Sequence, residues 1–288
     1  MSLARTGALP NSYKYFTIAV ESFHEKQMEG VIYHESREGA APFKGLIQMA
    51  HILNYISDEI HYPMKSLDER RLQKRALTDI PEEETVFSTS AHQERKGSLA
   101  TFRLHIKYRY NATWQGTVTH LETGAVYAFE SFKELMHLFK RLLGDGREER
   151  ATLGKRMCEV AVCDYREQSM GGEVSHPAVK DRFRFQNEFG LLEQLEHMFG
   201  ECPADIAGEK VIVPRQGSIY KGSVGPLTFI IRILFNKNAT WQGIICWKET
   251  GEQACFRSYL EMLLMMEGAV KRVIYDGLAK PDQKKVTA

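Results

Sequence analysis

The hexapeptide Asn-Ala-Thr-Trp-Gln-Gly occupies residues 111–116 and recurs, letter for letter, at residues 238–243. The two copies lie inside longer matching blocks, at 102–143 and 229–270, that align without a gap. Self-similarity at a fixed spacing indicates a chain built from copies of one structural unit. The rest of the chain is therefore expected to follow the same unit.

Two weaker copies align when the glycine that ends the hexapeptide is used as the anchor. In chain order the copies are A1, B1, A2 and B2. The A copies have methionine two positions before the glycine, the B copies have tryptophan there, and every copy has phenylalanine thirteen positions after it. The predicted structural anchors are Met28, Gly30, Phe43, Trp114, Gly116, Phe129, Met170, Gly172, Phe185, Trp241, Gly243 and Phe256.

Each copy is expected to form three strands followed by a helix. In B1, apolar and polar residues alternate over 102–109, which is typical of a strand with one buried face. Two turns lead into a second and a third strand, and apolar residues at spacings of three and four then predict an amphipathic helix over 132–142. Glu134 and Glu261 complete capping boxes with two of the N-cap residues. The aligned N-cap residues are Gly45, Ser131, Asn187 and Ser258.

The anchor glycine is expected to face the helix. Its missing side chain would let the helix backbone approach the sheet closely. The large residue two positions earlier is expected to be a core anchor, and a ligand-stacking role for Trp114 or Trp241 is the alternative.

The predicted fold class is α+β, with four tandem βββα repeats arranged as two pseudo-symmetric domains whose antiparallel sheets pack on helices. A single copy of about 45 residues is marginal alone, so each A–B pair should close one core. The 288 residues fit two such domains. The predicted boundaries are a flexible leader at 1–12, a first pair at 13–145 (A1 13–60, connector 61–98, B1 99–144), a linker at 146–154, a second pair at 155–275 (A2 155–200, connector 201–225, B2 226–275) and a disordered tail at 276–288.

The two connectors are expected to add elements of their own. An exposed helix is predicted over 66–77, and short strands over 85–89 and 210–213.

The composition is that of an ordinary globular chain, with 26% charged and 43% hydrophobic residues. A net charge of +1 gives no global attraction to nucleic acid or to an anionic membrane. The five cysteines form no CxxC pair, which favours reduced thiols in the cytoplasm. The N-terminus lacks a signal-peptide core, and no apolar run approaches the ~18 residues of a membrane span. A cytoplasmic protein without a membrane partner is predicted.

The sequence contains no recognisable catalytic signature: no acidic pair, no Ser-His-Asp order, no Cys-His nucleophile and no phosphate-binding loop. His34, His120 and His176 share one aligned position, which Trp247 fills in the fourth copy. Since the copies are separate and tryptophan cannot coordinate a metal, these histidines are expected to be strand-end side chains. The prediction is a non-enzyme without cofactor or metal.

The outward face of B1 is the best candidate for binding. A basic row on an open sheet can follow a phosphate backbone, which predicts a binding module for single-stranded nucleic acid. A solvated sheet face is the alternative, because the row lacks the exposed aromatic side chains on which bases stack. The candidate nucleic-acid-binding residues are Arg103, His105, Lys107, Arg109, Gln115 and Thr117.

The equivalent face of B2 is apolar, with candidate interface residues Ile230, Leu234 and Ile244. Such a face should be covered by the partner repeat, by the other domain or by a second chain, which includes a homodimer. A protein-interaction or regulatory adaptor is therefore the second hypothesis for the function.

The string Phe-Arg-Leu-x-Ile, followed by the hexapeptide, Glu-Thr-Gly and Phe-Glu-Ser, resembles a group of uncharacterised proteins from clostridia and related gut Firmicutes. The resemblance covers both B copies well and the A copies loosely; it implies a bacterial protein and brings no known activity. At the level of fold, strands followed by a helix in tandem are similar to the PUR/whirly class of single-stranded nucleic-acid binders. That class has four strands per repeat, whereas this chain has three clear ones.

Overall fold

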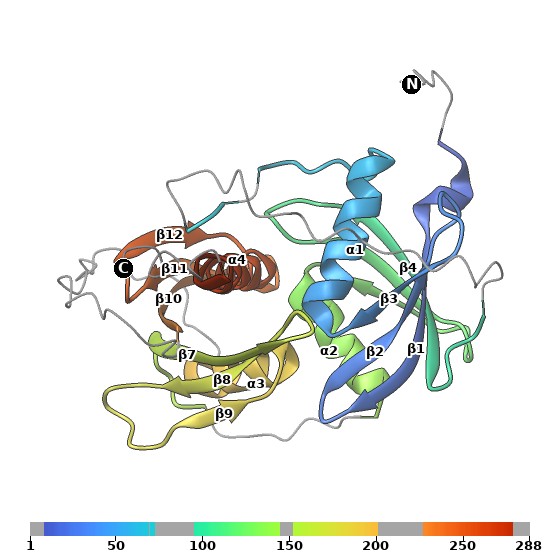
Figure 1. Cartoon of the computed structure of the whole chain (residues 1–288). Coiled ribbons are helices and arrows are strands. Elements are labelled where there is room, and N and C mark those ends of the chain that lie inside the picture. The colour runs from blue at the N-terminus through green and yellow to red at the C-terminus, as the bar shows by residue number, and fades with distance from the viewer. Residues whose placement is uncertain (1–8, 69, 73–94, 145–151, 201–226, 279–288) are drawn as a thin grey trace, which may run out of the picture.

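The computed structural model describes residues 9–68, 70–72, 95–144, 152–200 and 227–278. Within these residues the chain forms twelve β-strands, four α-helices and one short 3₁₀ helix, η1 (Asn11–Lys14) (Figure 1). The prediction of an α+β chain with antiparallel sheets packed on helices is confirmed.

The strands form two six-stranded sheets in which all paired neighbours are antiparallel. The first sheet has the order β3-β2-β1-β4-β5-β6 and the second the order β12-β11-β10-β7-β8-β9. The strands of the first sheet are β1 (Phe16–His24), β2 (Gln27–Tyr33), β3 (Ala40–Lys44), β4 (Ala100–Tyr108), β5 (Gln115–His120) and β6 (Val126–Phe129). Those of the second are β7 (Met157–Arg166), β8 (Ser169–Ser175), β9 (Phe183–Phe185), β10 (Leu227–Lys237), β11 (Thr240–Trp247) and β12 (Glu252–Phe256).

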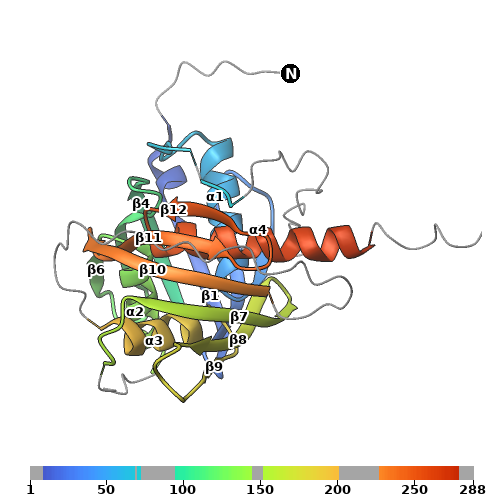
Figure 2. The ribbon, with the colours of Figure 1, turned by 90° about the vertical axis from the view of Figure 1, so that its left-hand side faces the viewer.

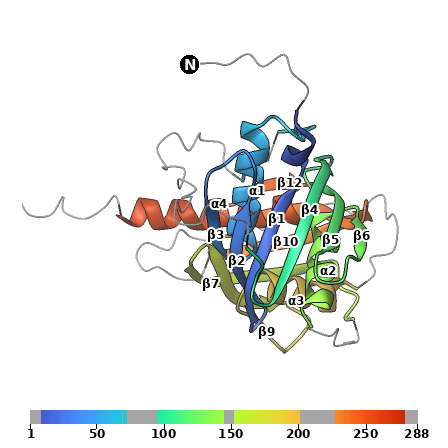
Figure 3. The same cartoon turned by 90° about the vertical axis from the view of Figure 1, so that its right-hand side faces the viewer.

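The two sheets are the outer layers of the molecule, and the helices lie between them (Figures 1, 2 and 3). α1 packs against α3 and β8, and α2 packs against α4 and β11. Buried apolar side chains from both sheets and all four helices belong to one contiguous cluster. The helices are α1 (Leu46–Glu59), α2 (Phe132–Leu142), α3 (Glu188–Phe199) and α4 (Tyr259–Leu278).

The chain turns in the same way four times, each time between the first two strands of a three-strand group. Each turn contains two residues with positive φ, as a type I′ turn requires. A β-bulge precedes each turn, where the register shifts between Val20 and Ser22, Ile106 and Tyr108, Val162 and Asp164, and Ile233 and Phe235. The turn residues, with φ from 49 to 64°, are Glu25 and Lys26, Asn111 and Ala112, Glu167 and Gln168, and Asn238 and Ala239.

The anchor glycines pair with the anchor phenylalanines across neighbouring strands, as Gly116 does with Phe129. A Cβ on Gly116 would lie 1.9 Å from the carbonyl oxygen of His105 and 3.1 Å from the Phe129 ring. The expectation that this glycine admits a helix backbone is therefore wrong; it makes room for the neighbouring strand and an aromatic ring. The other pairs are Gly30 with Phe43, Gly172 with Phe185, and Gly243 with Phe256.

All four predicted N-cap positions are confirmed, and three of them also join the two sheets. The hydroxyl of Ser131 accepts a hydrogen bond from the N–H of Glu134 and donates one to the carbonyl of Ala239 at 2.7 Å. Ser258 caps α4 and donates to the carbonyl of Ala112 at 2.6 Å. Asn187 caps α3 and reaches the turn of the first sheet at Glu25 in the same way. Each of these three caps therefore holds a turn of the opposite sheet.

Several predicted boundaries change. α4 continues to Leu278, so 276–278 are helical rather than part of a disordered tail, and η1 begins inside the predicted leader. The described part of the predicted helix at 66–77 is not helical. The strands predicted at 85–89 and 210–213, and residues 146–151 of the predicted linker, lie outside the described residues. No described helix combines the length and the apolar character needed to cross a membrane.

Candidate nucleic-acid interface

The outer surface of β4, β5 and β6, called the B1 face below, carries the predicted basic row. Arg103 pairs with Thr119 and His105 pairs with Thr117, so these side chains share one side of the sheet. Arg103 and Lys107 are exposed, and His105 and Thr117 are half-buried. None of the described side chains that face outward from these three strands is acidic. The B1 face is therefore locally basic although the whole chain is nearly neutral.

The bulge at Lys107 removes Arg109 from this row. Ile106 pairs with Gly116 and Tyr108 pairs with Gln115, so Lys107 is the extra residue and the alternation shifts by one position. Tyr108 then faces outward, 52% exposed, and Arg109 turns inward, 5% exposed. The prediction that Arg109 continues the row is wrong.

Arg109 instead makes buried contacts with α1 and with the segment that follows it. Its guanidinium forms an ion pair with Asp58 and donates to Asn54 Oδ1 at 2.8 Å and to the carbonyl of Pro63 at 3.4 Å. These partners fix the side chain between the layers rather than on the B1 face.

Gln115 has a structural role at the turn. Its amide accepts from the backbone N–H of Tyr110 at 3.0 Å and donates to the carbonyls of Tyr110 and Glu130 at 3.1 and 3.3 Å. In the second sheet the Gln242 amide accepts from the backbone N–H of Lys237 and donates to its carbonyl in the same way. The Gln115 side chain therefore positions Tyr110 and is engaged with the backbone.

An exposed aromatic pair lies beside the basic row. Tyr108 and Tyr110 are 52% and 51% exposed, and their rings are stacked with centroids 5.2 Å apart and planes at 12°. The sequence interpretation that this face lacks exposed aromatics is therefore wrong. The alternation pattern places Tyr108 on the buried side, and only the bulge brings it out.

Two further tyrosines surround His105. The ring of Tyr15 lies 4.8 Å from the His105 ring, and the ring of Tyr62 lies 6.5 Å away and nearly parallel to it. The Tyr62 hydroxyl is 3.2 Å from His105 Nε2. Together with the stacked pair these residues form the tyrosine cluster: Tyr15, Tyr62, Tyr108 and Tyr110.

The charges of the face come from Arg103 and Lys107 rather than from the histidine. Burial, followed by the nearby charges of Lys107 and Lys14, lowers the pKa of His105. At neutral pH the imidazole is therefore uncharged, and acidification adds a positive charge between the tyrosines.

The candidate protein-interface residues of B2, Ile230, Leu234 and Ile244, are half-buried on the outer surface of the second sheet. The bulge at Leu234 also brings out Phe235, which is exposed and lies under the ammonium group of Lys237 at 5.4 Å. Phe235 and Lys237 thus stand where the first sheet has the two stacked tyrosines.

The three aligned histidines lie at turns. His34 Nδ1 accepts from the N–H of Ser36, and His176 Nδ1 accepts from the N–H of Ala178. His120 Nδ1 lies 2.9 Å from the hydroxyl of Thr123. Among the described residues no group of three or more His, Cys, Asp or Glu side chains could hold a metal ion.

No protein-family model, curated protein or solved structure matches this chain. Its function is therefore argued from the geometry of the B1 face and the tyrosine cluster.

Proposed function

We propose that the chain is a non-catalytic module that binds single-stranded nucleic acid across the B1 face and the tyrosine cluster. The observation that carries this proposal is the stacked, half-exposed pair of Tyr108 and Tyr110 beside Lys107. Stacking of a base on an aromatic side chain contributes about 1–3 kcal/mol, and lysine and arginine bind the phosphates. The face offers both groups along β4 and the turn that follows it.

The arrangement favours single strands over duplex. The Gln115 amide holds the backbone of Tyr110, and the Tyr110 ring stacks on that of Tyr108, so the pair offers a platform for unpaired bases. Bases inside a duplex are stacked on one another and cannot occupy such a platform. Arg103 and Lys107 follow on the same strand, where a phosphate backbone can run along β4.

The test is fluorescence anisotropy of a labelled single-stranded oligonucleotide titrated with the full chain at several salt concentrations. Arg103→Glu combined with Lys107→Glu is expected to abolish binding at moderate salt, because each cation lost is replaced by a repelling charge. Tyr108→Ala combined with Tyr110→Ala is expected to weaken binding at least tenfold, roughly the loss of one stacked base.

A matched control makes the same charge change on the other sheet. Arg182→Glu combined with Arg184→Glu alters two exposed arginines beside Glu173 and should leave the affinity within about twofold. Three results would refute the proposed site. The control could lose as much affinity as the B1-face variant, the B1-face variant could bind as well as the wild type, or the wild type could fail to bind at low salt.

The alternative function, a protein-interaction adaptor, rests on the apolar outer surface of the second sheet, where Ile230, Leu234, Phe235 and Ile244 keep partial exposure. Leu234→Asp is then expected to release a partner or a second copy without unfolding the chain, as measured by light scattering. A variant that elutes with the same mass and partners as the wild type would rule out this surface.

We also propose that A1, B1, A2 and B2 are four copies of one βββα unit, arranged as two pseudo-symmetric halves that each form one sheet and share one core rather than closing a core each. Support comes from features that recur at aligned positions: the turn with two positive φ values, the bulge before it and the glycine–phenylalanine pair. Because these three features recur at the same positions of each copy, we infer that the copies arose by duplication of one unit.

A further inference from the structure

The contacts between the two halves of the chain come in pairs that exchange the halves. The first half comprises the described residues up to Gly144, and the second half comprises those from Thr152 onward. The hydroxyl of Ser131 donates to the carbonyl of Ala239, and the aligned Ser258 donates to the aligned carbonyl of Ala112. Between the sheets α1 packs on α3, and α2 packs on α4. Such reciprocity is typical of the interface in a two-fold symmetric dimer.

Six ion pairs between the halves share one polarity. In each of them the basic side chain belongs to the first half and the carboxylate to the second half. They are Lys26 and Lys140 with Glu193, Lys44 with Glu167, His51 with Glu267, and Lys133 and His137 with Glu196. The inner surface of the first half is therefore basic where the inner surface of the second half is acidic.

Two of these ion pairs occupy equivalent places with the signs exchanged. His51 of α1 aligns with Glu193 of α3, and Lys140 of α2 aligns with Glu267 of α4. His51 Nε2 lies 2.6 Å from the carboxylate of Glu267, and the ammonium group of Lys140 pairs with Glu193. The side chains of Lys140 and Glu267 are only 7% and 3% exposed, so solvent screens these charges weakly.

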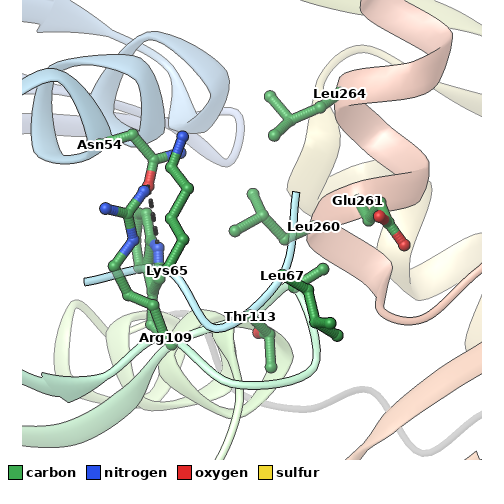
Figure 4. A pocket seen from close by; sticks show the side chains of 10 residues that line it. Asn54, Lys65, Leu67, Arg109, Thr113, Leu260, Glu261 and Leu264 are labelled. Atoms are coloured by element: carbon green, nitrogen blue, oxygen red, sulfur yellow. Dashed lines mark hydrogen bonds between the residues drawn. The ribbon is translucent and has the colours of Figure 1, made fainter. Parts of the chain in front are cut away.

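A third place shows the same polarity through the loss of charge on one side. Glu196 of α3 contacts Lys133 at 3.2 Å and His137 at 2.9 Å, both from α2. At the aligned place the second half presents apolar side chains to the first half (Figure 4). The two cations drawn beside them pair with a carboxylate of their own half. The aligned residues are Leu260 and Leu264 of α4 and Asn54 of α1.

Pairing of like halves through the same contacts would bring like charges together. Two first halves would set Lys26 and Lys140 against His51, which supplies no carboxylate. Two second halves would set Glu267 against Glu193 and would leave Glu196 facing leucine. Like charges in a partly desolvated interface are strongly unfavourable, so this arrangement discriminates against the wrong partner.

We propose that the basic inner surface of the first half recognises the acidic inner surface of a second half and excludes a copy of itself. The partner that this surface fits is the second half of this chain, within one molecule or by exchange between two molecules. The charges thus keep the chain from joining other copies through like halves. This proposal does not depend on nucleic-acid binding at the B1 face.

The test uses the full chain with a protease site in place of residues 146–150. The folded protein is cleaved, unfolded in urea and refolded, and native mass spectrometry then identifies the species. Pairs of one first half and one second half are expected. Pairs of like halves, or halves that stay separate or aggregate, would overturn the proposal.

A charge reversal at Glu193 tests the polarity. Glu193→Lys sets an ammonium group against Lys26 and Lys140, and it should weaken the pairing of the cleaved halves about a hundredfold, as measured by dilution. Adding Lys26→Glu and Lys140→Glu exchanges the signs and should restore the affinity to within about tenfold of the wild type. If Glu193→Lys alone does not fold, the sign-exchanged variant decides.

The matched control reverses a carboxylate that pairs within one half. Glu173 and Glu193 are each 25% exposed and each contact two cations, but those of Glu173 are Arg182 and Arg184 of its own half. Glu173→Lys should leave the pairing within about twofold. Unchanged pairing in Glu193→Lys, an equal loss in Glu173→Lys, or no recovery in the sign-exchanged variant would each overturn the proposal.

Discussion

Gly243 shows at the scale of one residue why the anchor positions admit no side chain. A Cβ there would lie 2.0 Å from the carbonyl oxygen of Arg232 and 2.8 Å from the Phe256 ring. The oxygen belongs to the backbone of the neighbouring strand, which cannot move without breaking its pairing. The Phe256 ring lies over Gly243 and occupies the space that a side chain at position 243 would need.

Gly243→Ala is expected to lower the free energy of unfolding by about 2–3 kcal/mol, because the added methyl group overpacks the sheet. Urea denaturation measures the change. Gly268→Ala is the matched control, since Gly268 lies in α4 with nothing within 4 Å of its Cβ position. That variant should gain about 0.5–1 kcal/mol from helix propensity. Equal effects at both positions would contradict the packing argument.

Glu188 is a buried acid at the first position of α3, where its carboxylate accepts from the N–H of Met170 at 2.9 Å. Burial raises its pKa to about 7 from the ordinary 4.5, although hydrogen bonds from Met170 and Ser169 oppose the change. Between these two values the folded chain holds a proton that the unfolded chain has released. The free energy of unfolding therefore falls as the pH rises through this window.

Glu188→Gln removes this contribution while keeping a hydrogen-bonding side chain. The stability of the variant relative to the wild type is expected to grow from pH 4.5 to about pH 7, by about 3 kcal/mol in total. Urea denaturation across this range measures it, with Glu130→Gln at the exposed Glu130 as control. Parallel curves for wild type and Glu188→Gln would show that Glu188 does not titrate in the window.

At the scale of elements, the hairpin turns and the bulges before them determine which side chains each strand exposes on the outer surface of its sheet. The turn and its preceding bulge shift the alternation by one residue, so neighbouring side chains such as Lys107 and Tyr108 point to the same side. The same device brings out Phe235 next to Leu234 in β10. One backbone feature therefore presents tyrosine and lysine on the first sheet and apolar side chains on the second.

These turns use side-chain-bearing residues where glycine is preferred. Ala239 has φ of 54°, a left-handed conformation that costs an L-residue about 1–2 kcal/mol. Ala239→Gly is expected to raise the free energy of unfolding by about 0.5–1 kcal/mol, after the greater freedom of glycine in the unfolded chain is subtracted. Thermal or urea unfolding tests this. Ala128→Gly, in strand β6, should destabilise instead, and a loss in both variants would argue against strain at the turn.

At the scale of the whole molecule, the two sheets are joined by one core and by polar contacts across it. α2 and α3 are joined at Glu196 of α3, whose carboxylate contacts the side chains of Lys133 and His137 of α2. Burial acts to raise the pKa of Glu196, but the hydrogen bond and charge of His137, with Lys133, hold it at about 2. This carboxylate therefore stabilises the fold above its ordinary pKa of 4.5, and that stabilisation is lost as the pH falls toward 2.

Glu196→Gln is expected to lower the free energy of unfolding at neutral pH by about 3 kcal/mol, with the difference from wild type disappearing toward pH 2. Because one core spans both sheets, wild type and variant should each unfold in a single calorimetric transition. Glu130→Gln serves again as the surface control. Two separate transitions, or a difference that persists at low pH, would contradict the shared-core interpretation.

Local properties of the chain were readable from the sequence. Alternation predicted the strands, spacings of three and four predicted the helices, and Ser131, Asn187 and Ser258 were found as caps, because each of these signals depends on residues within one turn or one strand. Arg103 and Lys107 were correctly expected to be exposed on the B1 face for the same reason.

The sequence by itself determined an α+β chain with a recurring hexapeptide, capped helices and one basic strand. Only the tertiary structure decided that the bulge turns Arg109 inward and Tyr108 outward, and that Tyr15 and Tyr62 gather around His105. The physical reasons are that a bulge adds one residue outside the two-residue period of its strand, and that Tyr15 and Tyr62 reach His105 from segments far away in the chain, so no periodic pattern signals either.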